Sequence, residues 1–414
     1  MTTNTTPIGA HRGAGRPEAT HAVERGLDRF AAEIGLDPAE VRRRNLVERF
    51  SEPFTTLTGA TYDTGDYPAA LERALSAAGY DALRADQAQR RTRGDALQLG
   101  IGLSVYVEIT GSSLEGPPHE VADVLVLPDG SVTVLTGTSP HGQGHATAWA
   151  MLVTEQTGIP IERITVRHGD TDLVPEGVGT YGSRSLQQGG VAVHQATREL
   201  VELARRRVAE LLEVDPDDVV LDKGRAALHV AGSPETAVSL ARLAELEPLQ
   251  VRSTFSPPGP TFPFGAHVAV VEVDVLTGKA RLLRLVAVDD AGTILNPLLA
   301  EGQRHGGYAQ GVAQALMEEV LYDEDGNPQT STLATYPFLS ITEVPSFELV
   351  GMATPTPYNP IGAKGVGESG TIGSTPAVHN AVIDAVSHLG VRHIDMPTTP
   401  QRVWRAIQHA KVAP

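Results

Sequence analysis

The stretch Leu97-Gln98-Leu99-Gly100-Ile101-Gly102-Leu103-Ser104-Val105-Tyr106-Val107 decides how the chain is organised. Its large apolar residues stand at every second position, which is the period of a β-strand. Upstream of this stretch, apolar residues recur at helical spacing instead, namely Val23, Leu27, Phe30 and Ile34. The sequence therefore predicts helices before about residue 92 and a sheet that begins at this stretch.

Two hairpins continue the predicted sheet downstream. Apolar runs at 124–126 and 132–134 flank Asp129-Gly130, and runs at 268–275 and 280–288 flank Thr277-Gly278. Helices are expected at 68–78, 144–157, 188–214, 302–320 and 376–389, with Leu200, Leu203 and Leu211 facing the core and Pro376 starting the last helix. We therefore expect an α+β fold of mixed sheets with flanking helices, divided near residue 92 and again near 215–260.

The composition excludes several classes of function. The 414 residues carry 33 Lys and Arg against 50 Asp and Glu, so the net charge is −17 and neither nucleic acid nor a membrane is expected as a partner. The first residues lack the basic and apolar segments of a leader, and no apolar run approaches the ~20 residues of a membrane span, so we expect a cytoplasmic protein. The absence of cysteine excludes thiolate metal sites and self-ligated iron–sulfur clusters, so redox chemistry must borrow its electron carriers.

Four glycine-rich clusters stand directly before predicted helices, at 10–18, 137–145, 179–185 and 364–370. A helix N-terminus with free amides suits a phosphate, and glycine lets the backbone approach it closely. Gly302-Gln303 repeats the glycine–glutamine pair found at Gly142-Gln143-Gly144. A single cluster is more often an ordinary turn. The four clusters and the Gly302-Gln303 segment together predict one large phosphorylated cofactor that is held from several sides.

Glu368 is a carboxylate among small residues with no neighbour in sequence to pair with, so it is a candidate general base. The segment 365–370 also matches the dinucleotide pattern G-x-G-x-x-G, but no buried strand is expected before it. A nicotinamide-dependent dehydrogenase is therefore a distant alternative. The 14 histidines form no His-Glu-x-x-His pattern and no G-x-S-x-G elbow occurs, so zinc hydrolysis and a serine nucleophile are not expected.

Taken together, these clusters resemble the molybdopterin-binding large subunit of the xanthine dehydrogenase, aldehyde oxidase and carbon monoxide dehydrogenase family. The matching segments are colinear over nearly the whole chain and lie at 12–18, 142–145, 169–172, 179–185, 296–297, 302–303 and 364–368. In this resemblance, residues 1–92 are the C-terminal end of the first molybdenum-cofactor subdomain, and residues 93–414 are the second molybdenum-cofactor domain.

The resemblance implies a molybdenum ion on the dithiolene of a pterin, often extended by cytidine diphosphate in bacterial members, with no protein side chain bound to the metal. It implies that Glu368 takes a proton while a water-derived oxygen reaches an aldehyde or an N-heterocycle and hydride passes to Mo=S. Arg12 is expected beside the metal, with a helix-flanking salt bridge as its alternative role. The implied cofactor contacts are Gly13, Gly142, Gln143, Gly144, Thr180, Gly182, Ser183, Arg184, Ser185, Gln303, Lys364, Gly365 and Val366.

Two departures from the family pattern refine these expectations. Its carbon monoxide dehydrogenases hold copper on a cysteine just after the arginine, whereas Gly13 follows Arg12 here, so we expect a hydroxylase-like member without copper. Ala14 and the loop 108–118 are expected to shape the substrate side.

The second departure is length, since the chain resembles about the C-terminal half of the family's subunit. A loop of the Gly-Gly-Phe-Gly type and a further metal-side glutamine, both expected upstream, are missing. We therefore expect a partner chain that supplies the missing half, with iron–sulfur clusters and FAD on further subunits. The alternative is a truncated, cofactor-free fragment with a structural or assembly role.

Overall fold

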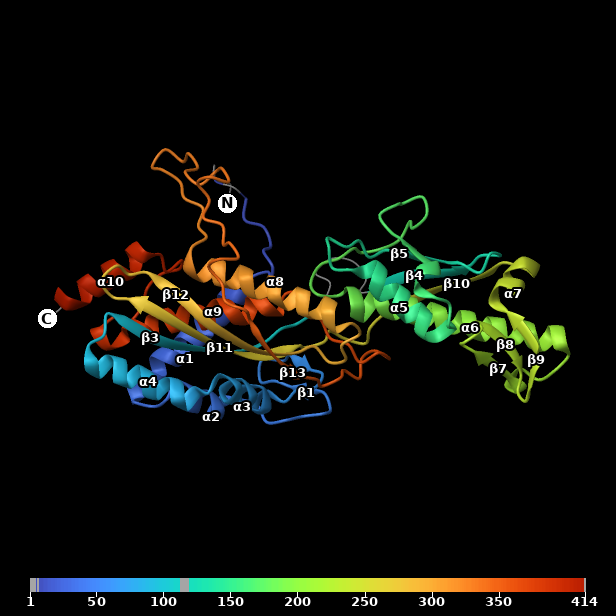
Figure 1. Ribbon diagram of the computed structural model, residues 1–414, viewed down its shortest axis with the longest axis horizontal. Coiled ribbons are helices and arrows are strands. Elements are labelled where there is room, and N and C mark those ends of the chain that lie inside the picture. Colours follow the sequence, from blue (N-terminus) through green and yellow to red (C-terminus); the bar gives the residue numbers. More distant parts are fainter. Residues whose placement is uncertain (1–4, 6, 112–118, 413–414) are drawn as a thin grey trace.

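The computed structural model describes residue 5, residues 7–111 and residues 119–412, which form two bodies side by side (Figure 1). The first body is built on a four-stranded sheet in the order β13-β12-β11-β3. Its strands are β3 (Leu97–Val107), β11 (Phe264–Asp274), β12 (Ala280–Asp290) and β13 (Glu348–Met352), antiparallel except for the β12–β13 pair.

Helices cover both faces of this sheet. One face carries α3 (Tyr67–Ala78) and α4 (Tyr80–Arg93), and the other carries α8 (Pro297–Leu316) and α9 (Ser369–Val386). The same body also contains α1 (Arg16–Ile34) against α9, α2 (Pro38–Asn45), the short pair β1 (Phe54–Thr55) and β2 (Thr61–Tyr62), and α10 (Pro400–Val412).

Strand β3 confirms the prediction made for residues 97–107, and the structure explains its alternation. Ile101 and Leu103 are buried on the side of α3. At the alternate positions, a Cβ added to Gly100 would lie 1.9 Å from the carbonyl oxygen of Ala381, and one added to Gly102 would lie 2.0 Å from that of Ala377. The glycines therefore let α9 lie directly on the backbone of β3.

The second body is built on the sheet β10-β4-β5-β6. Its strands are β4 (Glu120–Val126), β5 (Val132–Thr136), β6 (Ile164–Arg167) and β10 (Leu249–Phe255). Two helices, α5 (His145–Thr157) and α6 (Val191–Leu212), pack on the sheet around Trp149. A single turn of π-helix at Leu186–Gly190 leads into α6. A small sheet of β7 (Val219–Asp222), β8 (Ala227–Val230) and β9 (Ser233–Ser239), followed by α7 (Leu240–Leu246), closes the far end.

The predicted α+β class is confirmed, and so are both predicted hairpins, β4–β5 and β11–β12. The predicted division near 92 and near 215–260 stays a prediction. The two four-stranded sheets use different parts of the chain: strands within 97–107 and 264–352 form one, and strands within 120–167 and 249–255 form the other. Among the described residues, no helix combines the length and the apolar character that crossing a bilayer would need.

Two predicted helix starts are wrong. α8 begins at Pro297, capped by the Asn296 side chain, rather than at 302, and α9 begins at Ser369 with Pro376 inside it. In both cases glycines that look like turns lie within a helix, because the two helices pack very closely. A Cβ on Gly311 of α8 would lie 2.0 Å from the Ser374 hydroxyl of α9.

The prediction that Leu211 faces the core is wrong, and the apolar residues that indicated α1 do not form its buried face. Val23, Phe30 and Ile34 of α1 are 62%, 53% and 46% exposed, and Leu211 of α6 is 52% exposed, whereas Leu200 is fully buried and Leu203 partly buried. The face of α1 that is buried carries Glu24 instead, whose carboxylate accepts a hydrogen bond of 2.7 Å from Arg42 Nε. A buried ion pair therefore lies on the packed side of α1.

Candidate active site

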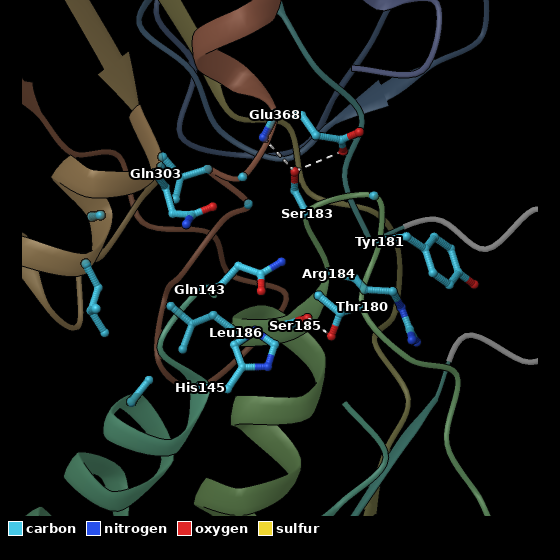
Figure 2. Close-up of a pocket in the computed structure, with 18 of the residues that line it drawn as sticks. Gln143, His145, Thr180, Tyr181, Ser183, Arg184, Ser185, Leu186, Gln303 and Glu368 are labelled. Carbon is cyan, nitrogen blue, oxygen red and sulfur yellow. Dashed lines mark hydrogen bonds between the residues drawn. The ribbon is translucent and has the colours of Figure 1, made fainter. Parts of the chain in front are cut away.

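A cavity of about 680 Å³ lies where loops of the two bodies meet. All five glycine-rich segments line it, through residues of 10–12, 141–145, 180–186, Gln303 and 364–368. Figure 2 shows Glu368 and Ser183 at one end of this cavity and His145 at the opposite end. The predicted convergence of these distant segments on one space is therefore present in the fold.

Most of the predicted site residues line this cavity. They are Arg12, Gly142, Gln143, Thr180, Gly182, Ser183, Arg184, Ser185, Gln303, Lys364, Gly365, Val366 and Glu368. Gly13 and Gly144 stand behind the lining, the first as a donor to Glu368 and the second as the left-handed N-cap of α5. Ala14 is exposed and is not among the lining residues, and 112–118 of the predicted substrate loop lie outside the described residues.

Glu368 caps the N-terminus of α9 and is partly exposed. Its Oε1 accepts a hydrogen bond of 3.0 Å from the Gly13 backbone N–H, and its Oε2 accepts one of 3.0 Å from the Ser183 hydroxyl. The Ser183 hydroxyl in turn accepts the Glu368 backbone N–H at 3.1 Å (Figure 2). The carboxylate lacks neighbours in sequence, as expected, but two distant loops hold it in place.

Arg12 joins α8 to the turn before α9. Its Nε donates to the Gly367 carbonyl at 2.5 Å, and its Nη2 donates to the backbone carbonyl and the side-chain oxygen of Gln303 at 2.8 and 3.2 Å. Burial lowers the pKa of Arg12, and the nearby Glu368 and Glu108 act in the opposite direction. These partners are carbonyl and amide oxygens rather than the carboxylate of the alternative salt bridge, and they fix a cation beside Glu368.

The wall opposite Glu368 is less tightly bonded. The Gln143 side-chain oxygen accepts the His141 backbone N–H of its own loop, and the Ser185 hydroxyl donates to the Thr180 hydroxyl at 3.1 Å. Gln303, predicted at the start of a helix, lies inside α8 and lines the same cavity. These amides and hydroxyls therefore have hydrogen-bonding capacity left for a ligand.

His145 also lines the cavity, although it was not predicted to contact the cofactor. It is buried at the first position of α5, its ring lies 5.1 Å from that of Trp149, and its Nδ1 has no hydrogen-bond partner within the described residues. Burial, aided by His168 and His141, lowers the pKa of His145 to about 4, so its ring is neutral. A buried unpaired ring nitrogen beside a helix N-terminus is a place where a polar ligand group fits.

Two predicted contact residues have their charged ends bound to the protein itself. Arg184 is fully buried and pairs with Glu120. Burial raises the pKa of Glu120, although the charge of Arg184 acts in the opposite direction. Lys364 Nζ donates to the Thr64 carbonyl at 2.8 Å and lies 3.5 Å from Asp63. Their contacts with a cofactor stay predictions, whereas their charges pair with buried carboxyl groups of the protein.

Gly365 explains the close contact between the 182–185 loop and the turn before α9. A Cβ on Gly365 would lie 2.6 Å from both the Cβ and the carbonyl oxygen of Ser183. The dinucleotide alternative finds no support in this geometry, since the described chain between β13 and Gly365 contains no strand. The turn therefore does not follow a strand as that pattern requires.

Glu108 is the residue that the sequence analysis missed, since it appeared there only as the first residue of a loop. It directly follows β3, has no exposed surface, and accepts a hydrogen bond of 2.8 Å from the Ser369 hydroxyl. Burial, followed by the charge of Glu368, raises the pKa of Glu108 to about 8. The available signal was an acidic residue immediately after an apolar strand.

The donor set fits a molybdopterin. The cavity has the size of a cofactor pocket, and glutamine amides, hydroxyls and a helix N-terminus surround it. The unpartnered His145 nitrogen is consistent with a polar ligand at that end.

Comparisons with known proteins agree with this arrangement. A family profile described as a molybdopterin cofactor-binding domain matches residues 73–345, and a second profile of the same description matches residues 1–46. The carbon monoxide dehydrogenase large chain of Hydrogenophaga pseudoflava is 38% identical over 418 residues, covering 96% of this chain and 51% of that protein. The nicotine 6-hydroxylase large subunit of Paenarthrobacter nicotinovorans is 35% identical, covering 98% of this chain and 51% of that protein.

A solved structure is similar as well. The crystal structure of quinoline 2-oxidoreductase from Pseudomonas putida 86 matches with a TM-score of 0.88 and 35% identity, over 97% of this chain and 53% of that one. The chain thus spans about half the length of these relatives and matches them over nearly all of its own length.

Proposed function

This chain belongs to the molybdopterin cofactor-binding subunits of the molybdenum-dependent oxidoreductases, and from that premise we propose that it helps to hydroxylate an N-heterocycle or an aldehyde. The observation that carries the proposal is the convergence of five distant glycine-rich segments on one cavity with Glu368 at its wall. N-heterocycles are favoured because two of the relatives are named for nicotine and quinoline. Copper is not expected, because Gly13 follows Arg12 and the chain has no cysteine.

The cofactor we propose is molybdopterin in its cytosine dinucleotide form. Gln143 and Gln303 would hold the polar edges of a pterin through their amide groups, and the hydroxyls and amides of Thr180 and the 182–185 loop would hold its phosphates. When bound, the molybdenum centre supplies a two-electron acceptor and a water-derived oxygen.

Glu368 is the proposed general base. Each of its carboxylate oxygens accepts one protein hydrogen bond and keeps a free lone pair, so either can take a proton as oxygen is transferred to the substrate carbon. Arg12 holds the turn that carries Glu368 against α8 and adds a positive charge beside it. Gly13 and Ser183 orient the carboxylate by donating to its two oxygens.

The partners we propose are a chain or segment that supplies the other half of the molybdenum subunit, and subunits that carry iron–sulfur clusters and FAD. Support for the first comes from the relatives, which are about twice as long, and from the exposed apolar stripe Val23, Phe30 and Ile34 on α1. Support for the second is the absence of cysteine, since electrons then need another carrier. The cytoplasmic location stays a prediction, which fractionation of the native cell would test.

The test is the cofactor and partner content of the protein purified from its native source. Molybdenum, cytidylate released from it and co-purifying iron–sulfur and flavin chains are the expected result. Gln143→Ala and Gln303→Ala should each lower the molybdenum content several-fold, whereas Gln401→Ala, at an exposed position of α10, should leave it unchanged. A native protein without molybdenum, cytidylate or partners would contradict the proposal and favour the cofactor-free fragment.

A further inference from the structure

A second carboxyl group lies directly behind Glu368. Glu108 is completely buried after the end of β3 and does not line the cavity. Its Oε2 accepts the Ser369 hydroxyl at 2.8 Å, and its Oε1 lies 3.4 Å from the Ser183 hydroxyl oxygen. Because Ser183 also bonds Glu368, one hydroxyl connects the two carboxyl groups.

The hydrogen atoms available at Ser183 restrict the possible protonation states. The Ser183 oxygen already accepts the Glu368 backbone N–H, and its single hydroxyl hydrogen faces two carboxyl oxygens. If both carboxyl groups were ionised, one of the two oxygens that face Ser183 would lack a donor, and two negative charges would lie close together. A proton on Glu108 Oε1, donated to the Ser183 oxygen, leaves the Ser183 hydrogen free to donate to Glu368 and satisfies every group.

The surroundings indicate which of the two carboxyl groups holds this proton. Glu368 is partly exposed, stands at the N-terminus of α9 and accepts a second hydrogen bond from Gly13, so its carboxyl group has solvent and a further donor in reach. Glu108 has no exposed surface. The other ionisable groups that act on or respond to Glu108 are Arg12, Arg16 and Tyr106.

We propose that Glu108 is a positioning residue that, in its protonated form, donates from Oε1 to the Ser183 oxygen and so directs the Ser183 hydrogen to Glu368 Oε2. The inference rests on the proposed function in taking Glu368 as the base. Burial raises the pKa of Glu108 to about 8, which agrees with a protonated group at neutral pH. Above that pH the Ser183 hydrogen is shared between two carboxylates, and Glu368 loses its fixed orientation.

Infrared spectroscopy of the full chain without cofactor tests the protonation directly. The C=O stretching absorption of protonated carboxylic acids should contain a component that titrates with a midpoint near 8, and this component should be absent in Glu108→Gln. Glu24→Gln removes a different buried glutamate, whose pKa burial raises to about 7, and should leave the component with its midpoint near 8 in place. Equal acid bands in Glu108→Gln and in the unmodified protein would overturn the proposal.

A second variant keeps the test decisive if Glu108→Gln does not fold. Ser183→Ala removes the acceptor of the Glu108 proton, so the acid band should shift to higher frequency; an unmoved band would contradict the relay. In the loaded complex, an alkaline fall in kcat with a midpoint near 8 should vanish in Glu108→Gln, since glutamine donates at every pH. Because the infrared test needs no cofactor, its failure differs from a failure to find molybdenum.

Discussion

Lys364 and Glu368 stand at the two ends of one turn, yet their environments are opposite. Lys364 Nζ is buried among Asp63, the Thr64 carbonyl and the Phe262 carbonyl, and it lies 5.4 Å from the centre of the Phe264 ring. Glu368 is partly exposed to the cavity and meets neutral donors from Gly13 and Ser183. The buried lysine is thus paired directly with an opposite charge, whereas the proposed base accepts its hydrogen bonds from neutral donors and has the Arg12 guanidinium only nearby.

The largest expected effect concerns the Glu368 end. In a complete, molybdenum-loaded complex, Glu368→Gln should lower turnover by roughly 10²- to 10⁴-fold, because the amide keeps the shape but cannot accept the proton. Molybdenum content and melting temperature should change little, since Gly13 retains an oxygen acceptor there. Near-native turnover with normal metal content would show that Glu368 is not the base, and its contrast with Lys364 would then have no functional meaning.

At the Lys364 end the effect should fall on stability instead. Lys364→Met leaves the fully buried Asp63 without its cation, which should lower the free energy of unfolding by ~3–5 kcal/mol. Chemical denaturation of the isolated chain measures this change, with Lys279→Met, at an exposed position, as the control. If both variants unfold alike, Lys364 is not the structural cation that we describe.

A substitution at Gly365, between Lys364 and Glu368, should reduce both stability and cofactor binding. Gly365→Ala introduces a Cβ 2.6 Å from Ser183, so that the 182–185 loop must move, at an expected cost of ~1–3 kcal/mol. We expect a lower melting temperature together with reduced molybdenum content. Gly302→Ala is the matched control, because its Cβ meets nothing within 4 Å inside α8 and should be neutral or stabilising. Identical behaviour of the two variants would argue against a tight contact at Gly365.

The smallest expected effect is a pH dependence set by Glu108. Its pKa is raised from 4.5 to about 8 on folding, so its contribution to stability is full below about pH 4.5 and is lost as the pH rises through 8. Glu108→Gln lacks this loss, so the melting-temperature difference between the variant and the unmodified protein should shift by a few degrees in its favour from about pH 5 to about pH 9. The other titratable groups, including Glu24, are the same in both proteins, so their effects on the melting temperature cancel in this difference. A constant difference would mean that Glu108 does not titrate in this window.

Local signals predicted much of this molecule. The alternation at 97–107, the turn at Asp129-Gly130 and the colinear glycine clusters give the sheets, a hairpin and the convergence on one cavity. Each of these features depends on residues close in sequence or on a pattern that recurs.

Contacts between distant segments set what the sequence did not reveal. Pro376 appeared to start a helix because nothing local shows that α9 begins at Ser369, against glycines of α8. Helical spacing at 23–34 indicated a helix, but it could not show that the buried face of α1 carries Glu24, which pairs with Arg42. Glu108 was missed for the same reason, since its partners come from 183 and 369.

The close contact of α9 with the backbone of β3 has a mechanical consequence for the proposed base at the N-terminus of α9. Ala377 rests against Gly102, and Glu368 stands nine residues earlier, about 13 Å along the helix axis. A tilt of about 5° at that seat would displace the carboxylate by about 1 Å, a misplacement that can cost an enzyme about a hundredfold in rate. Two glycines in the middle of a strand therefore set the position of the proposed base, because the side chains that would push α9 away are absent.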